Sequence, residues 1–407
     1  MIDINADFHI HGKYSGGVSE DMTIPLIATQ APLKGLHVVA TADALHGRWR
    51  QHLRDNLTEK GGLYSTVGST TKFIIQTEVE DMRRVHHVIL LPSLEAAESL
   101  AEKFAKHSKN MDVDGRPNVS LSGVELVDHV RSVGGLIGPA HAFTPWTAVY
   151  KEYGSLRECY GDNLRHVHFL ELGLSADTDS ADRIAELADL TFMSNSDCHS
   201  PWPHRLGREF NRLRVKELSF DEIRKAILRE DGRGFTLNAG LNPLEGKYHL
   251  TACSRCYLKF KWADALKLKR RCPECGGLIK KGVAERTLEL ASWSEPHHPE
   301  HRPPYMRIIP LAEAIGLAIG VSTVTSKKIK SRWDTLVARF GTEINVLIDA
   351  NIKEVIEADR EVGQVISLMR DGRLKYVGGG GGMYGRPTLT NEKDKYYSGN
   401  QKTLDEY

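Results

Sequence analysis

The stretch Asp7-Phe8-His9-Ile10-His11 places two histidines at alternate positions where a short apolar run ends. Alternate side chains of a β-strand share one face, so this spacing directs both imidazoles to the same side. Further metal-ligand residue types border apolar runs at Asp43, Glu78, His87, His141, Asp197 and His199. We therefore expect these ligands to gather at one end of an α/β barrel, where enzymes of that architecture carry their sites.

The composition is that of a globular protein, with 41% hydrophobic and 26% charged residues. A length of 407 residues favours two or three domains. The formal net charge is only +1, so charge alone does not indicate a nucleic-acid partner. The sequence has no apolar run long enough to cross a membrane, and its first residues do not resemble a secretory signal. We expect a cytoplasmic protein, associated with the nucleoid if it acts on DNA.

Residues 1–242 alternate strand-like and helix-like patterns. Short apolar runs at 36–41, 73–77 and 88–91 predict strands. Ser122 is a predicted helix N-cap, and Ser219 with Glu222 forms a predicted capping box. Strands separated by helices of this length predict parallel βαβ units, and many such units in series predict a barrel.

Residues 243–292 hold two Cys-x-x-Cys pairs, Cys253 with Cys256 and Cys272 with Cys275, separated by 15 residues. This spacing is typical of a tetrahedral structural zinc site, and a reducing compartment disfavours the alternative of two disulfides. Between Lys247 and Arg286, eleven Lys or Arg residues stand against three Asp or Glu. Aromatic residues interleave with these cations, which suits contacts with phosphates and stacking on bases. A solvated basic face around a small fold is the alternative.

The remaining chain divides into three parts. A proline-rich linker is expected at 293–304, and residues 305–377 have the apolar period of helices. Lys327 and Lys328 precede one of these helices and are candidates for contacts with a DNA backbone or for a solvated face. Five glycines at 378–382 predict a hinge before a flexible tail, 378–407. The spacing of Gln401, Leu404 and Tyr407 resembles a peptide that binds a DNA sliding clamp, and chance similarity is the alternative.

In their order along the chain, the motifs of the first segment resemble those of the polymerase-and-histidinol-phosphatase (PHP) family. The resemblance implies a distorted (β/α)7 barrel that holds two or three metal ions. It assigns as ligands His9, His11, Asp43, Glu78, His87, His141, Asp197 and His199. Asp43 stands where many members have histidine, and an oxygen ligand there would admit Mg²⁺ or Mn²⁺ besides Zn²⁺. Whether His46 or His87 is a ligand stays open.

The order of segments, a PHP-like barrel, a basic four-cysteine module and a helical region, resembles the endonuclease Q family. That resemblance implies a nick in double-stranded DNA on the 5′ side of uracil, hypoxanthine, xanthine or an abasic site. The expected catalytic residues are His9, Glu78, Asp197 and His199. The expected DNA contacts are Arg48, Arg50, Lys259, Lys269, Arg270, Arg271, Lys327 and Lys328. The expected walls of a pocket for a base flipped out of the duplex are Tyr14, Phe143, Trp146 and Trp202, with ordinary packing as the alternative for each.

Three other functions are compatible with parts of this pattern. A phosphoesterase for a small phosphate ester would use the same metal ligands but would need neither the basic module nor the helical region. A 3′→5′ exonuclease would share the barrel and would require a free DNA end. A non-catalytic DNA-binding scaffold would retain only a vestigial barrel, which the apparently full ligand set argues against.

Overall fold

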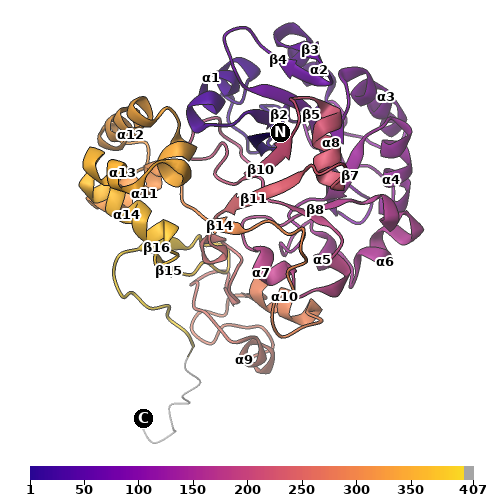
Figure 1. The fold of residues 1–407 in the computed structure, drawn as a ribbon. Helices are drawn as coiled ribbons and strands as arrows, with labels where there is room; N and C mark the ends of the chain where they lie inside the picture. Colours follow the sequence, from indigo (N-terminus) through magenta and orange to yellow (C-terminus); the bar gives the residue numbers. More distant parts are fainter. Residues whose placement is uncertain (398–407) are drawn as a thin grey trace, which may run out of the picture.

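Strand β1 (Ile2–Asp7) lies inside the main sheet of the computed structural model, which describes residues 1–397. It pairs with β2 (Val38–Ala40) on one side and β10 (Phe210–Val215) on the other. The other barrel strands are β5 (Lys72–Glu80), β6 (His86–Leu91), β7 (Leu136–Pro139), β8 (Phe169–Glu171), β9 (Thr191–Met193) and β11 (Gly234–Gly240). β8 lies beside β7 and β9 beside β11, so the strands form a ring (Figure 1). The predicted fold class, a distorted α/β barrel, is confirmed.

The sequence predicts that all barrel strands are parallel, and the structure differs from this at some strands. β1, β2 and β5 are parallel, as are β8 and β9, but β6 runs antiparallel to both β5 and β7. The reason is the short turn 81–85, in which Asp81 Oδ1 accepts hydrogen bonds from the backbone N–H groups of Arg83 and Val85. Such a turn joins only antiparallel strands. It brings the first residues of β6 to the barrel end where β5 finishes.

Helices cover the outside of the ring (Figure 1). Their bounds are α1 (Ile24–Lys34), α2 (Gly47–Asn56), α3 (Leu94–Ala105), α4 (Gly123–Ser132), α5 (Val149–Glu152), α6 (Leu156–Tyr160), α7 (Thr178–Ala181) and α8 (Phe220–Leu228). Ser122 caps α4 in a full capping box with Glu125. Ser219 caps α8, but the predicted reciprocal bond from Glu222 is replaced by an ion pair with Arg233. A small hairpin of β3 (Thr58–Lys60) and β4 (Leu63–Ser65) extends the sheet beyond β5.

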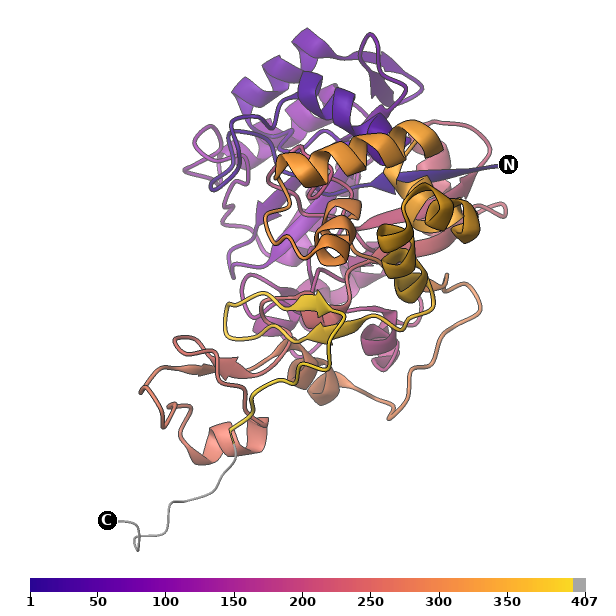
Figure 2. The same cartoon turned by 90° about the vertical axis from the view of Figure 1, so that its left-hand side faces the viewer.

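The four-cysteine module projects from one end of the barrel (Figure 2). It contains β12 (Ala252–Cys253), α9 (Trp262–Lys267) and β13 (Ile279–Lys280) around a small apolar core of its own. The next helix, α10 (Val283–Leu290), packs instead against the barrel core through Val283. The predicted linker 293–304 lies on the barrel surface, where the Arg302 guanidinium and the Asp182 carboxylate form a buried ion pair. The chain then returns to the main sheet as β14 (Tyr305–Arg307) beside β11.

The helical region consists of α11 (Leu311–Ile319), α12 (Lys327–Phe340), α13 (Ile352–Ala358) and α14 (Arg360–Arg370), and it shares one hydrophobic core with the barrel. Lys34 of α1 reaches across this interface to Glu343, with 2.6 Å between Nζ and Oε1 and both side chains fully buried. None of the helices within residues 1–397 is both long and apolar enough to cross a membrane.

The glycine run 378–382 does not form the predicted hinge. It joins the paired strands β15 (Lys375–Val377) and β16 (Arg386–Thr388), and Gly379 and Gly380 are buried. The Gly379 backbone exchanges hydrogen bonds with Leu244 and Leu250. A Cβ on Gly380 would lie 2.5 Å from the Leu250 carbonyl oxygen, so close backbone approach requires glycine here. The predicted clamp peptide, with Gln401, Leu404 and Tyr407, lies outside the described residues.

Candidate metal centre and lesion pocket

Seven side chains form one continuous cluster at the barrel end where β1, β5, β7 and β9 finish. It consists of three overlapping groups of ligand atoms, which are His9–His11–Glu78, His11–Asp197–His199 and Glu78–His86–His141. Six of these residues were predicted from the sequence, and His86 was not. Because β6 runs antiparallel to β5, its first residue reaches the same end of the barrel as Glu78.

Glu78 is the centre of the cluster. Its Oε1 lies 2.9 Å from His86 Nδ1 and 3.1 Å from His141 Nε2, and its Oε2 lies 3.4 Å from His11 Nε2. His11 Nε2 is also 3.2 Å from Asp197 Oδ1. Among residues 1–397, the buried atoms His9 Nε2, His11 Nε2 and His86 Nδ1 have no hydrogen-bond partner, although each faces a carboxylate. Converging imidazoles and carboxylates with unsatisfied ring nitrogens fit the donor set of Zn²⁺ or Mn²⁺.

The charges in the cluster compensate one another. Burial raises the pKa of Glu78, but His86, His11 and His141 outweigh that effect and hold the pKa well below its usual range. Burial similarly lowers the pKa of His9, but Glu171, followed by Glu78 and Asp197, raises it to about 9. His9 therefore holds a proton beside the carboxylates when no metal is bound. Metal binding must displace that proton, because imidazole ligates in its neutral form.

Glu171, at the end of β8, orients two of the histidines and was not predicted. Its oxygens lie 3.0 Å from His9 Nδ1, and one accepts a hydrogen bond of 2.8 Å from the backbone N–H of His141. Carboxylates that hold the non-ligating nitrogen of a histidine fix the ring tautomer and its direction. Glu171 thus points His9 Nε2 toward Glu78.

Two predicted ligands lie outside the cluster. His87 does not join this cluster, since its side chain faces the other side of β6, where Nε2 meets Asp81 and Nδ1 meets the hydroxyl of Tyr160. There it forms a separate buried group of possible ligand atoms with Asp81 and Cys159. Asp43 lies beside the cluster, with Oδ1 3.2 Å from His11 Nδ1, while Oδ2 accepts hydrogen bonds from Gly12 N and Ser15 Oγ. It holds the His11 ring instead of adding an atom to the three groups.

The sequence left open whether His46 is a metal ligand. In the structure its ring contacts the start of α2 and is not part of the cluster. Its Nδ1 accepts a hydrogen bond from the Trp49 backbone at the start of α2. Its ring stacks on Tyr14 with 4.8 Å between the centroids.

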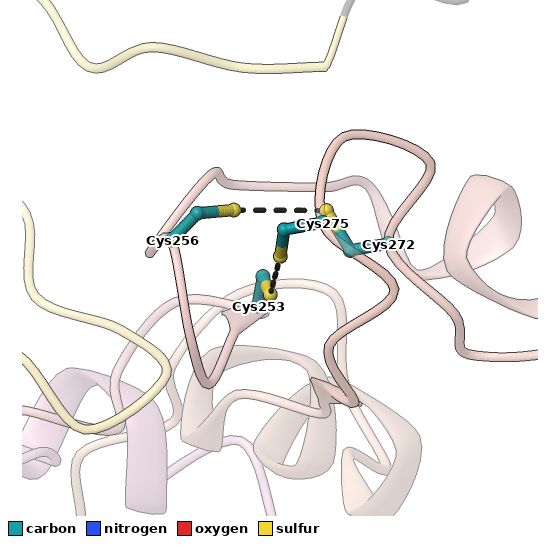
Figure 3. Close-up of side chains that lie close together, drawn as sticks. All are labelled: Cys253, Cys256, Cys272 and Cys275. Carbon is teal, nitrogen blue, oxygen red and sulfur yellow. Dashed lines mark hydrogen bonds between the residues drawn. The ribbon is translucent and has the colours of Figure 1, made fainter.

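The four predicted zinc ligands come together in the projecting module (Figure 3). Cys253 Sγ lies 3.5 Å from Cys275 Sγ, Cys256 Sγ lies 3.6 Å from Cys272 Sγ, and the four sulfurs lie within 4.8 Å of one another. Gly277 is packed against this group, since a Cβ there would lie 2.7 Å from Cys253 Sγ. Four thiols grouped this way fit a tetrahedral zinc ion.

Some of the predicted DNA-contact residues are exposed, and others are bonded to groups within the protein. Exposed ones are Arg48, Lys269, Arg270, Arg271, Lys327 and Lys328. Two predictions were wrong because the cations are used inside the protein. The Arg50 guanidinium donates to the backbone carbonyls of Ala44 and Leu45. The Lys259 ammonium is buried in an ion pair with Asp394.

A cavity of about 470 Å³ opens over the metal cluster. Besides residues of the cluster, the lining includes Trp146, Lys247, Tyr248 and Tyr384, which we call the aromatic wall. Trp146 meets Tyr248 edge to face at 6.3 Å, and the ammonium of Lys280 lies 4.4 Å above the Trp146 ring. This wall combines a barrel loop, the start of the cysteine module and the segment after the glycine run. Tyr248 and Tyr384 were not predicted, because neither is near a barrel ligand motif in the sequence.

Of the four predicted pocket aromatics, only Trp146 lines this cavity. Phe143 is buried and stacks on Tyr150 at 5.3 Å, so it belongs to the core. Trp202 lines a separate apolar groove beside α12, and Tyr14 stacks on His46. The predictions for Phe143, Trp202 and Tyr14 as cavity walls were wrong, since nearness in sequence to a ligand loop did not determine side-chain direction.

Comparisons with known proteins agree with this architecture. The lesion-specific endonuclease PfuEndoQ from Pyrococcus furiosus has a crystal structure with 47% sequence identity and a TM-score of 0.91, covering 96% of each chain. The chain belongs to the endonuclease Q family. Another crystal structure, of endonuclease Q in complex with a 27-mer duplex substrate that has an abasic lesion at the active site, has the same identity and TM-score. It covers 96% of this chain and 97% of that one.

Two relatives whose names call them uncharacterized proteins are also similar to this chain. YqxK of Bacillus subtilis is 33% identical over 409 residues, which cover 95% of this chain and 99% of that protein. MJ0043 of Methanocaldococcus jannaschii is 46% identical over 272 residues, or 66% of this chain. The match spans only 34% of MJ0043, about a third of its length. Residues 310–373, in the helical region, match the family model of the MJ0043 C-terminal domain.

Proposed function

We propose that this protein is a metal-dependent DNA repair endonuclease that nicks the phosphodiester bond 5′ of a deaminated base or an abasic site. The observation that carries this proposal is a single cavity that is lined both by residues of the metal cluster and by Trp146, Tyr248 and Tyr384. Its volume of about 470 Å³ suits a small-molecule guest and excludes a duplex. An extrahelical nucleotide is therefore the substrate part that fits between the aromatic rings and the cluster.

The chain supplies two kinds of groups for this reaction. His9, His11, Glu78, His86, His141, Asp197 and His199 would hold the metal ions, and Glu171 and Asp43 would orient two of the imidazoles. When bound, such ions lower the pKa of water and withdraw charge from the phosphate. Trp146, Tyr248 and Tyr384 would stack on the displaced nucleotide and exclude water, while Lys247 and Lys280 meet the adjoining phosphates.

Uracil, hypoxanthine and xanthine are proposed substrates because damaged or mismatched bases cost less to move out of the stack. Zn²⁺ at the four cysteines would keep the cysteine module folded, and with it the position of Tyr248. Zn²⁺, Mg²⁺ and Mn²⁺ are the proposed ions for the barrel cluster. The exposed cations Arg48, Lys269, Arg270, Arg271, Lys327 and Lys328 are proposed contacts with the duplex backbone.

A nicking assay tests the proposal. The substrate is a 5′-labelled duplex with one central deoxyinosine, deoxyuridine or abasic site, incubated with Mg²⁺ or Mn²⁺ beside an undamaged duplex. We expect one cut immediately 5′ of the lesion, none in the undamaged control, and none with Asp197→Asn, which should still bind the duplex. A ladder that starts at the ends would instead identify an exonuclease. Hydrolysis of small phosphate esters without any nick would identify a small-molecule phosphoesterase.

A further inference from the structure

Arg116 brings a cation to the metal cluster from a loop that carries no other member of it. Its Nη1 lies 3.3 Å from Glu78 Oε2, and 30% of its side chain is exposed, toward the cavity that it helps to line. The sequence around it, Asn110-Met-Asp-Val-Asp-Gly-Arg116, lies between α3 and α4 and resembles an ordinary polar loop. The cation is therefore recognised only from the folded chain.

The hydrogen bonds of Arg116 differ from those of a structural arginine. Arg302 donates to Asp182, Leu190 and Leu187 from all three of its guanidinium nitrogens and is buried. In residues 1–397, Arg116 has a single side-chain hydrogen bond, from Nη1 to Glu78. Since a guanidinium has five N–H donors in a rigid plane, the rest of this group is available to a ligand in the cavity.

The backbone around Arg116 is fixed against the same cluster. Gly115 N donates to the Tyr14 carbonyl at 3.1 Å, and Asp114 Oδ1 accepts from Arg116 N at 3.0 Å. A Cβ on Gly115 would lie 2.3 Å from Asp43 Oδ2, so the loop sits in direct contact with the residue that holds His11. A side chain anchored this way points to a defined place and needs little reorganisation when a substrate arrives.

We propose that Arg116 is a catalytic residue whose guanidinium donates to a non-bridging oxygen of the scissile phosphate; this inference rests on the proposed endonuclease function. In the reaction, a water oxygen forms a bond to phosphorus, the bond from phosphorus to the 3′-oxygen breaks, and that oxygen takes up a proton. Arg116 transfers no proton. It offsets the charge that accumulates on the phosphate oxygens, for which a planar guanidinium is better suited than an ammonium.

Single-turnover cleavage of an abasic-site duplex measures this role. We expect Arg116→Ala to slow the cleavage step about 10²–10³-fold, the usual effect of removing one donor to a charged transition state. Arg116→Lys should recover only part of the rate. Metal content by mass spectrometry should be unchanged, and the Kd for the duplex should change by less than about tenfold, one phosphate contact among many.

A modified substrate separates direct contact from an indirect effect. In a duplex whose scissile linkage is a methylphosphonate, one non-bridging oxygen is a neutral methyl group. On the stereoisomer that lacks the contacted oxygen, the contact with Arg116 is already absent. The factor by which Arg116→Ala slows cleavage should therefore be at least about tenfold smaller there than on the natural linkage, because two changes to one interaction are not additive. An equal loss on both stereoisomers and on the natural linkage would overturn the proposal.

Arg84→Ala is the matched control. Like Arg116, Arg84 lies beside a glutamate of β5, in this case Glu80, but its side chain is 75% exposed and does not line the cavity. This variant should cleave at the wild-type rate. If wild-type protein nicks the lesion and Arg116→Ala does so equally fast, only the inference about Arg116 fails. If wild-type protein does not nick the lesion at all, the proposed function fails and the inference fails with it.

Discussion

The Nδ1 atom of His86 lies 2.9 Å from Glu78 Oε1, whereas its neighbour His87 lies on the opposite face of β6 against Asp81 and Tyr160. Alternation along the strand thus divides an adjacent pair of histidines between a metal cluster and a buried hydrogen-bond network. The two positions provide a matched pair of substitutions with opposite expected effects.

His86→Ala should remove metal from the barrel and slow cleavage by at least about 100-fold, because even outer partners of metal ligands cost 10–100-fold in affinity or activity. His87→Ala should retain its metal. It should lower the free energy of unfolding by about 1–3 kcal/mol, since Asp81 and the Tyr160 hydroxyl would be left without a buried partner. Metal analysis and urea denaturation of both variants measure these effects. Loss of metal in His87→Ala alone would reverse the assignment of the two residues.

The sequence predicted His87 as a ligand, whereas the structure places His86 in the cluster. This difference shows which parts of the site could be predicted from the sequence. Residues such as His9, Glu78, His141 and Asp197 follow recognisable strand ends, and the structure brings them together as expected. His86 reaches the ligand end of the barrel because β6 runs antiparallel to β5, a direction that the short turn 81–85 decides and apolar periodicity does not reveal. Glu171, Arg116, Tyr248 and Tyr384 have no local motif, because only tertiary packing brings them to the cavity.

The predictions for the larger segments also succeed where the signal is local and fail where it depends on distant contacts. The two Cys-x-x-Cys pairs predict their cluster well, because the spacing itself encodes a knuckle for each pair. Composition alone predicts a hinge at the glycine run 378–382. Its contacts with Leu244 and Leu250 come from segments more than a hundred residues earlier in the chain, which no local pattern reports.

Loss of the proposed zinc ion should allow the cysteine module to separate from the barrel. Cys272→Ser leaves three thiolates, and the module has only a small core of Phe260, Ala265 and Ile279 to replace a metal worth about 10–16 kcal/mol. We expect the zinc to dissociate and lesion DNA to bind more weakly, by about 1–3 kcal/mol for each aromatic ring that no longer stacks on the nucleotide. The barrel should remain folded. Cys159→Ala, which changes a buried thiol outside the module, should retain zinc and DNA binding. Full lesion affinity in Cys272→Ser would contradict a role of the module in the cavity wall.

Removal of one partner from the buried ion pair of Lys34 and Glu343 should destabilise the contact between the barrel and the helical region. Glu343 also accepts hydrogen bonds from Trp333 Nε1 at 2.6 Å and Leu311 N at 3.0 Å, and it is fully buried. Lys34→Met leaves that carboxylate without a counter-charge and should cost about 3–5 kcal/mol of unfolding free energy.

The double variant Lys34→Met/Glu343→Gln removes both charges and should recover part of that stability. Chemical denaturation of the single and double variants gives the coupling energy. Equal stability of wild-type protein and Lys34→Met would show that the pair contributes nothing net.

The fully buried Glu209 should make stability depend on pH. Burial raises its pKa to about 8, against partial compensation from the backbone N–H of Leu241 and from Arg208. The folded state therefore keeps this proton over a range in which the unfolded chain, with a pKa of 4.5, has released it. Its contribution is fully present below the unfolded pKa and is lost as pH rises through about 8, with a slope of at most about 1.4 kcal/mol per pH unit.

Glu209→Gln removes the titration and can retain the hydrogen bond that Oε1 accepts from Leu241 N at 2.8 Å. Between pH 5.5 and 7.5, wild-type protein should lose up to about 3 kcal/mol of unfolding free energy relative to the variant. Urea denaturation of both proteins at the two pH values measures this difference, and titrations common to both cancel. Parallel stability curves would mean that Glu209 is ionised in the folded protein, and its charge would then be balanced by Arg208.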